Sequence, residues 1–162
     1  GPEMKSTGEV MGSGSSLDKA LYKAFVASGF KFKEEGSVLF TIDNNHKEEA
    51  FKLAKRFVNV GFKLYGTPGT AQAFSEKGLS VEVLEKIHGK DMSLLDSIAH
   101  GEVDMVINTI GKDKSQNSDG YQIRKVATEY GVALFTSLDT AEAILRVLEA
   151  RQLNVEAIGD HL

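Results

Sequence analysis

Residues 62–77 read FKLYGTPGTAQAFSEK, and this stretch decides the predicted fold. It begins with a short apolar segment, Phe62–Tyr65, which is typical of a buried strand. It continues through a glycine-flanked turn, Gly66–Thr70, into the segment Thr70–Lys77, which predicts a short helix ending at Gly78. A strand that passes through a short turn into a helix is the repeating unit of a parallel α/β sheet. The stretch therefore predicts an α/β protein.

The same unit recurs on both sides of this stretch. Short apolar runs predict five strands, at Ser37–Ile42, Phe62–Tyr65, Val81–Leu84, Val103–Asn108 and Val132–Phe135. Apolar residues at helical spacing predict helices at Leu17–Phe30, Lys47–Val60, Thr70–Lys77, Ser93–His100, Tyr121–Tyr130 and Ser137–Gln152. Strands of nearly continuous apolar character are buried on both faces, and parallel strands need right-handed crossovers. We therefore expect a three-layer, doubly wound fold of the Rossmann-like or flavodoxin-like kind, with a mainly parallel five-stranded sheet.

The composition narrows the classes of function. The chain has 162 residues, enough for one domain with a sizeable core, and 41% of them are hydrophobic. Lys and Arg number 19 and Asp and Glu 23, so the net charge is −4, which argues against a basic nucleic-acid-binding surface. The absence of cysteine excludes disulfides, cysteine nucleophiles and thiolate metal sites. No apolar run approaches ~20 residues and no signal-peptide pattern is present, so we expect a soluble cytoplasmic protein with no membrane or nucleic-acid partner.

The predicted turn at Gly66–Thr70 has the features of a phosphate-binding loop. Doubly wound folds bind ligands at the carboxyl ends of their strands, which is where this turn lies. Gly69 lets the backbone come close to a ligand, the helix start offers free N–H groups, and Thr67 and Thr70 add hydroxyls. The loop lacks the lysine of a nucleoside triphosphatase loop. A tight turn with an N-cap threonine explains the same residues equally well.

Polar residues follow three other predicted strands at the same edge of the sheet. Lys47 would lie in the first turn of a helix, where a nearby anion would explain a cation that opposes the helix dipole. Lys86 follows the third strand, and Asn108 and Thr109 follow the fourth. No pair of histidines has a convincing set of partner ligands for a metal. These residues together predict a small phosphorylated ligand and no metal.

Several segments resemble one known family. They are GFKLYGTPGTAQAF (61–74), VLEKIHGK (83–90), VDMVINT (103–109) and YQIRKVATEYGVALFTSLDTAEAIL (121–145). They are similar to the methylglyoxal-synthase-like domain that ends the large subunit of carbamoyl phosphate synthase of bacterial, Gram-positive type. The opening residues GPEMKSTGEVMG (1–12) resemble the end of the preceding synthetase domain. The resemblance implies a linker and helix at residues 1–30 and a regulatory domain at residues 31–162.

The resemblance implies a regulatory role for this chain rather than a catalytic one. Domains of this family bind nucleotide effectors of the glutamine-dependent synthase, a ligase of pyrimidine and arginine biosynthesis. UMP inhibits the enzyme, and IMP or phosphoribosyl pyrophosphate activates it in some members. The parent enzyme uses ATP with Mg or Mn, whereas this chain would carry no cofactor. Its expected partners are the nucleotide, the remainder of the large subunit and the glutaminase small subunit.

The resemblance also assigns residues to the effector site. The phosphate-binding positions of the family fall on Lys47, Thr67, Gly69, Thr70 and Lys86. The base- and ribose-binding positions fall on Asn108, Thr109, Asp119 and Ile123. Leu134 stands where ornithine-activated members have a tyrosine, so ornithine activation is not expected.

The alternative is an enzyme, a methylglyoxal-synthase-type lyase that acts on dihydroxyacetone phosphate. The segment at residues 89–91, Gly-Lys-Asp, resembles one that holds a catalytic aspartate in that family, which makes Asp91 a candidate acid/base. The second aspartate of that family follows a tryptophan, and this chain has none. The matching region here, residues 108–111, reads Asn-Thr-Ile-Gly. The sequence therefore favours the regulatory domain over the lyase.

Overall fold

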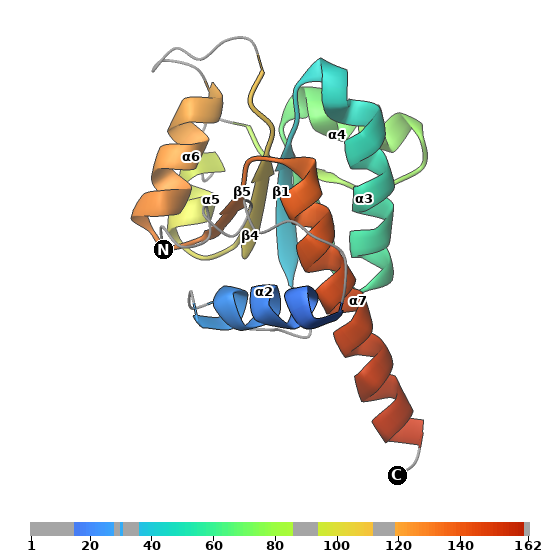
Figure 1. Cartoon of the computed structure of the whole chain (residues 1–162). Helices are drawn as coiled ribbons and strands as arrows, with labels where there is room; N and C mark the ends of the chain where they lie inside the picture. Colours follow the sequence, from blue (N-terminus) through green and yellow to red (C-terminus); the bar gives the residue numbers. More distant parts are fainter. Residues whose placement is uncertain (1–14, 28–29, 31–35, 86–93, 112–118, 161–162) are drawn as a thin grey trace.

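The computed structural model describes residues 15–27, 30, 36–85, 94–111 and 119–160 (Figure 1). The strands are β1 (Ser37–Thr41), β2 (Lys63–Gly66), β3 (Glu82–Val83), β4 (Met105–Asn108) and β5 (Ala133–Phe135). The helices are α2 (Ser15–Ala27), α3 (Lys47–Asn59), α4 (Pro68–Glu76), α5 (Leu94–Ala99), α6 (Asp119–Glu129) and α7 (Leu138–Asp160), and a 3₁₀ turn, η2 (Asn44–His46), precedes α3.

The five strands form one parallel sheet in the order β3-β2-β1-β4-β5, which confirms the predicted doubly wound α/β fold. From β1 the chain moves outward through β2 to β3, and then continues on the other side of β1 with β4 and β5. The strand order therefore reverses between β1 and β4, where folds of this kind form a ligand crevice. The register pairs Phe40 with Gly66 and Thr41 with Asn108. Three neighbouring strand ends therefore meet at this point.

Alternate side chains of the strands fill two cores, one on each face of the sheet. Phe40 of β1 belongs to the core under α2, α3, α4 and α7, and its ring meets Phe57 and Phe74 edge-on at centroid distances of 5.9 and 5.5 Å. The adjacent Leu39 belongs to the second core, under α5 and α6 on the opposite face (Figure 1). Because helices cover both faces, the strands need apolar residues at successive positions, as the sequence has them.

The ends of most helices agree with the predicted start and stop residues. Glycines with positive φ follow α3 and α4, at Gly61 (95°) and Gly78 (97°). Further glycines with positive φ follow α5 and α6. Ser137 caps α7, because its Oγ accepts a hydrogen bond from the backbone N–H of Thr140 at 3.2 Å.

Several helix boundaries differ from the prediction. Helix α2, predicted at Leu17–Phe30, runs from Ser15 to Ala27, and α6, predicted to begin at Tyr121, begins at Asp119. The helix predicted to begin at Thr70 begins at Pro68, because proline is favoured at the first helical position, where its missing N–H needs no partner. The helix predicted to end at Gln152 continues to Asp160, because no glycine or proline follows until Gly159. No helix in the described ranges is long and apolar enough to cross a membrane.

Helix α2 packs as part of this domain. It lies against α7 (Figure 1), and its Leu21 and Phe25 are buried in the first core. The Phe25 ring stacks on Phe30 at a centroid distance of 4.2 Å and contacts Phe135 of β5 at 5.9 Å. Helix α2, which lies within the predicted segment 1–30, therefore contributes side chains to the first core of the domain.

The packing of α2 leads to a stability prediction. Phe25 is fully buried, whereas its neighbour Val26 is 40% exposed. We expect Phe25→Ala to lower the free energy of unfolding by ~3–5 kcal/mol, because it leaves a cavity against the sheet. The control Val26→Ala should change it by less than about 1 kcal/mol. Urea unfolding measures both, and equal, small effects would show that α2 does not pack on the domain in solution.

Candidate functional site

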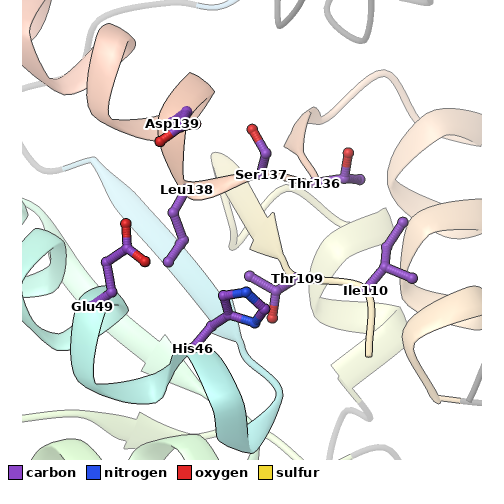
Figure 2. A pocket seen from close by; sticks show the side chains of 8 residues that line it. All are labelled: His46, Glu49, Thr109, Ile110, Thr136, Ser137, Leu138 and Asp139. Atoms are coloured by element: carbon purple, nitrogen blue, oxygen red, sulfur yellow. The ribbon is translucent and has the colours of Figure 1, made fainter. Parts of the chain in front are cut away.

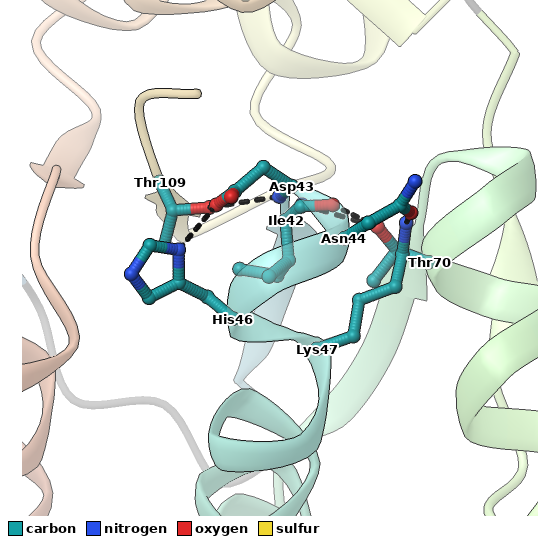
Figure 3. A network of polar contacts seen from close by, with 7 residues as sticks. All are labelled: Ile42, Asp43, Asn44, His46, Lys47, Thr70 and Thr109. Atoms are coloured by element: carbon teal, nitrogen blue, oxygen red, sulfur yellow. Dashed lines mark hydrogen bonds and ion pairs between the residues drawn. The ribbon is translucent and has the colours of Figure 1, made fainter. Parts of the chain in front are cut away.

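The predicted ligand edge brings together side chains from the ends of β1, β2 and β4. The segment that leaves β1 holds Thr41 to Lys47, the turn after β2 holds Thr67 to Thr70, and β4 ends at Asn108. Figure 3 shows several of these side chains around the segment that leaves β1, with Lys47 and His46 on opposite sides of it. The edge therefore has two sides.

The turn after β2 leads directly into the first turn of α4. Thr67 is the residue before the helix, with extended backbone angles, and its N–H donates to Phe40 O at 3.3 Å. Its hydroxyl donates to Thr70 Oγ1 at 3.2 Å and does not cap the helix. Pro68 has no N–H, so the N–H groups of Gly69 and Thr70 are those that the first turn presents without a carbonyl partner inside the helix. These two groups form an anion-binding start of a helix.

Thr70 ties this turn to β1. Its side chain is buried, and its Oγ1 accepts a hydrogen bond from Ile42 N at 3.1 Å and donates to Ile42 O at 3.4 Å. With the bond from Thr67, both lone pairs and the single proton of the hydroxyl are used. In this structure Thr70 therefore shapes the loop through its hydroxyl, and the group that it can offer a ligand is its backbone N–H.

Lys47 places its charge over the start of α4. A Cβ added to Gly69 would lie 3.6 Å from Lys47 Nζ, so the ammonium lies beside the first turn. Lys47 Nζ donates to Asn44 Oδ1, and among the residues that the structure describes Lys47 has no acidic partner. The ammonium faces the positive end of α4. Lys47 is also the first residue of α3, so its charge opposes the dipoles of both helices. A bound anion would relieve this repulsion.

Asn108 closes β4 beside this site. It is 1% exposed, its Nδ2 donates to Thr41 Oγ1 at 3.1 Å, and its Oδ1 accepts from Arg124 Nη1 at 2.7 Å. Arg124 could not be predicted from the sequence, because a single arginine on a helix has no local signal that would set it apart from solvated charges. Its distinguishing feature is the tertiary contact with a strand end.

On the other side of the edge, Thr109 joins Asp43 and His46 in a polar cluster (Figure 3). Thr109 Oγ1 donates to Asp43 Oδ1 at 2.6 Å and accepts from Asp43 N at 2.9 Å, and His46 Nδ1 lies 2.6 Å from the same carboxylate oxygen. Partial burial alone would raise the pKa of Asp43. The hydrogen bonds from Thr109 and His46, together with the charge of a protonated His46, outweigh burial and hold this pKa below its ordinary value of 3.8.

This cluster borders a pocket of about 280 Å³ between the ends of β1, β4 and β5 (Figure 2). Its lining comes from η2 and α3, from the residues after β4, and from the turn after β5 with the start of α7: His46, Glu49, Thr109, Ile110, Thr136, Ser137, Leu138 and Asp139. This pocket could not be predicted from the sequence, because its residues are separated in the chain and share no motif. Thr109, which was predicted to bind the base or ribose, thus faces this pocket and Asp43.

Three of the predicted residues have side chains outside the described part of the chain. Lys86 and Asp91 lie outside the described residues, and so does the side chain of Asp119, the first residue of α6. Ile123 is fully buried in the second core. Within the described part of the chain, no three His, Asp or Glu side chains come close enough together to hold a metal ion.

The fold and the site define a class of protein. The chain is a doubly wound α/β domain that presents a cation and a helix start at the carboxyl edge of its sheet. The MGS-like domain family matches residues 49–136, more than half of the chain, so the chain belongs to the MGS-like domain family. The match includes Thr67, Thr70 and Asn108, and Lys47 lies just before it.

A solved structure has a similar fold. A methylglyoxal synthase from Elizabethkingia anophelis NUHP1 is similar to this chain with a TM-score of 0.56 and 18% sequence identity. The similarity covers 70% of this chain and 79% of that protein. At this level of identity the likeness concerns the fold.

The pKa of Asp43 leads to a pH prediction. A carboxyl whose pKa is lowered by folding stabilises the fold above its unfolded pKa, and this contribution is lost as the pH falls through the folded value. We expect the difference in unfolding free energy between the wild type and Asp43→Asn, measured between pH 7 and about pH 3, to shrink as the pH falls below 3.8, the ordinary value of this pKa. Urea unfolding across this range measures it.

The variant Thr109→Val is the control for the cause of the lowered pKa. It removes the Thr109 hydroxyl, which donates to Asp43, and keeps the Asp43 carboxyl. The pH dependence should be weaker in that background. Parallel stability curves for the wild type and Asp43→Asn down to pH 3 would contradict the assignment.

Proposed function

We propose that this chain is the allosteric nucleotide-binding domain of a glutamine-dependent carbamoyl phosphate synthase large subunit. In this proposal the domain binds UMP as an inhibitor, or IMP or phosphoribosyl pyrophosphate as an activator. The chain itself carries out no reaction. The parent ligase would supply the ATP- and metal-dependent chemistry, with the remainder of the large subunit and the glutaminase subunit as partners in the cytoplasm.

The observation that carries the proposal is the position of the Lys47 ammonium beside the first turn of α4. An ammonium and two free N–H groups of a helix start are the groups that bind a phosphate in proteins. Lys86, which the resemblance assigns to the same phosphate, would add a second cation. A 5′-phosphate therefore has a place at the end of β2.

The crevice between β1 and β4 supports the other half of the proposal. Asn108 ends β4 next to Thr41 of β1, and Arg124 of α6 reaches the same point. The Asn108 amide is bonded at both ends, so the group left there to recognise the oxygen acceptors of a base or a pyrophosphate is the Arg124 guanidinium. A phosphate group at one end and polar recognition at the other fit a nucleotide better than inorganic phosphate.

The link to the synthase comes from the sequence. The residues 1–12, GPEMKSTGEVMG, resemble the end of a synthetase domain, and a free-standing lyase has no use for such a segment. Leu134, in β5, stands where the resemblance places a tyrosine in ornithine-activated members. Effectors other than ornithine are therefore proposed.

A second candidate function is a methylglyoxal-synthase-type lyase. The observation that favours it is the fold shared with a methylglyoxal synthase. Its weakness is the chemistry, because enolisation of dihydroxyacetone phosphate needs a placed base and groups that polarise the carbonyl. Asp91 is the candidate base, but this sequence has no counterpart of the Trp-Asp pair of that family.

A binding experiment tests the proposed phosphate site. Losing a charge-assisted hydrogen bond costs ~1.5–3 kcal/mol, which is roughly ten- to hundredfold in affinity. We expect Lys47→Ala to weaken UMP binding by this factor in isothermal titration calorimetry. The control is Lys52→Ala, an exposed lysine on the same helix, which should bind UMP like the wild type. Unchanged UMP affinity in Lys47→Ala would rule out this phosphate site.

An activity assay separates the two candidate functions. We expect the chain to form no methylglyoxal from dihydroxyacetone phosphate above the rate in buffer, because the partner set for enolisation is incomplete. Colorimetric detection of methylglyoxal measures this. Turnover that disappears in Asp91→Asn would establish the lyase in place of the regulatory domain.

A further inference from the structure

The side chain of Asn108 is enclosed by protein. It is 1% exposed, and both ends of its amide are bonded: Nδ2 to Thr41 Oγ1 and Oδ1 to Arg124 Nη1. Because an arginine can only donate, it fixes the amide with its oxygen toward α6. An enclosed amide of fixed orientation is suited to holding a neighbouring side chain in place. The residue that it holds, Arg124, is therefore the better candidate for contact with a ligand.

Arg124 has donors to spare. Its side chain is only partly buried, and a guanidinium carries five N–H donors in a planar fork. Among the described residues, the single contact of this fork is the 2.7 Å bond to Asn108, and no carboxylate neutralises it. A charged fork with no acidic partner in the described part of the chain, fixed at the crevice between β1 and β4, is a recognition group for oxygen acceptors.

Gly120 makes this position of the guanidinium possible. A Cβ at residue 120 would lie 2.9 Å from Arg124 Nη1 and 3.6 Å from Asn108 Nδ2. A glycine in the first turn of α6 lowers helix stability relative to alanine. The close approach of the guanidinium explains why the chain has a glycine there.

The distance between this group and the phosphate site limits the ligand. Arg124 reaches the end of β4, whereas Lys47 and the start of α4 lie at the end of β2, with β1 between them. Two strand spacings amount to about 9.5 Å, which is more than one phosphate group spans. A ligand that touches both ends is therefore elongated, with a phosphate at one end and oxygen acceptors at the other.

We propose that Arg124 is the ligand-contacting specificity residue of this site, that Asn108 positions it, and that Gly120 provides the space it needs. This inference rests on the proposed nucleotide-binding function and deepens it. The group that Arg124 recognises carries oxygen acceptors, either the carbonyl oxygens of a base or the pyrophosphate of phosphoribosyl pyrophosphate. Ribose 5-phosphate has neither group, so it engages Lys47 and not Arg124.

Titration of three ligands into four variants of the full chain tests the assignment. UMP, phosphoribosyl pyrophosphate and ribose 5-phosphate are the probes, and Arg124→Met, Gly120→Ala, Asn108→Ala and the Asn108→Ala/Arg124→Met pair are the variants. Arg124→Met should bind UMP or phosphoribosyl pyrophosphate about ten- to hundredfold more weakly and ribose 5-phosphate unchanged. Gly120→Ala should show the same selective loss without a loss of stability in urea unfolding, because the displaced atom is the end of a flexible side chain.

The pair of variants separates positioning from contact. If Asn108 acts through Arg124, the double variant should be no weaker than Arg124→Met alone, whereas independent contacts would give additive losses and overturn the positioning role. Lys125→Met, the adjacent exposed cation on α6, is the charge-matched control and should bind like the wild type.

The outcomes distinguish this inference from the proposed function. Wild-type affinity in Arg124→Met, with weakened binding in Lys47→Ala, would overturn the role of Arg124 and leave the nucleotide site intact. An equal loss for all three ligands would also overturn it, because that result indicates general damage to the site. A wild-type chain that binds none of the three ligands would overturn both proposals.

Discussion

The segment that leaves β1 holds the ligand edge together. β1 pairs with β2 on one side and with β4 on the other. The residues that follow it bond to both neighbours in turn: Ile42 to Thr70 at the start of α4, and Asp43 to Thr109 after β4. These bonds fix the two sides of the crevice relative to each other. The positions of Lys47, the α4 start and Asn108 all depend on this arrangement.

The same segment explains why the edge is suited to an anion. Lys47 extends from it toward the start of α4, where its charge meets the positive end of a helix dipole. The Thr70 hydroxyl is hydrogen-bonded to the backbone N–H and carbonyl of Ile42. These bonds hold the turn so that the N–H groups of the α4 start face outward. The polar cluster of Asp43, His46 and Thr109 lies on the opposite side and borders a separate pocket. One short segment thus serves two different surfaces.

The fold could be predicted from the sequence because its signals are local: apolar strands alternate with amphipathic helices, and glycines end the helices. The placement of Lys47, Thr67 and Gly69 at one edge follows from the same pattern. The roles of individual side chains did not follow, because they depend on contacts between distant residues. In the sequence, Thr70 could equally donate to a phosphate or hold the turn in place. The hydroxyl contact to Ile42, which distinguishes the two roles, is visible only in three dimensions. Arg124 and Gly120 had no local signal at all.

The most direct test of the account is to map backbone N–H chemical shifts while UMP is added to the full chain. The account predicts the largest shifts at the N–H groups of Gly69 and Thr70, with inorganic phosphate shifting the same two groups. Shifts confined to the pocket beside His46 and Ser137, or no shifts at all, would contradict it.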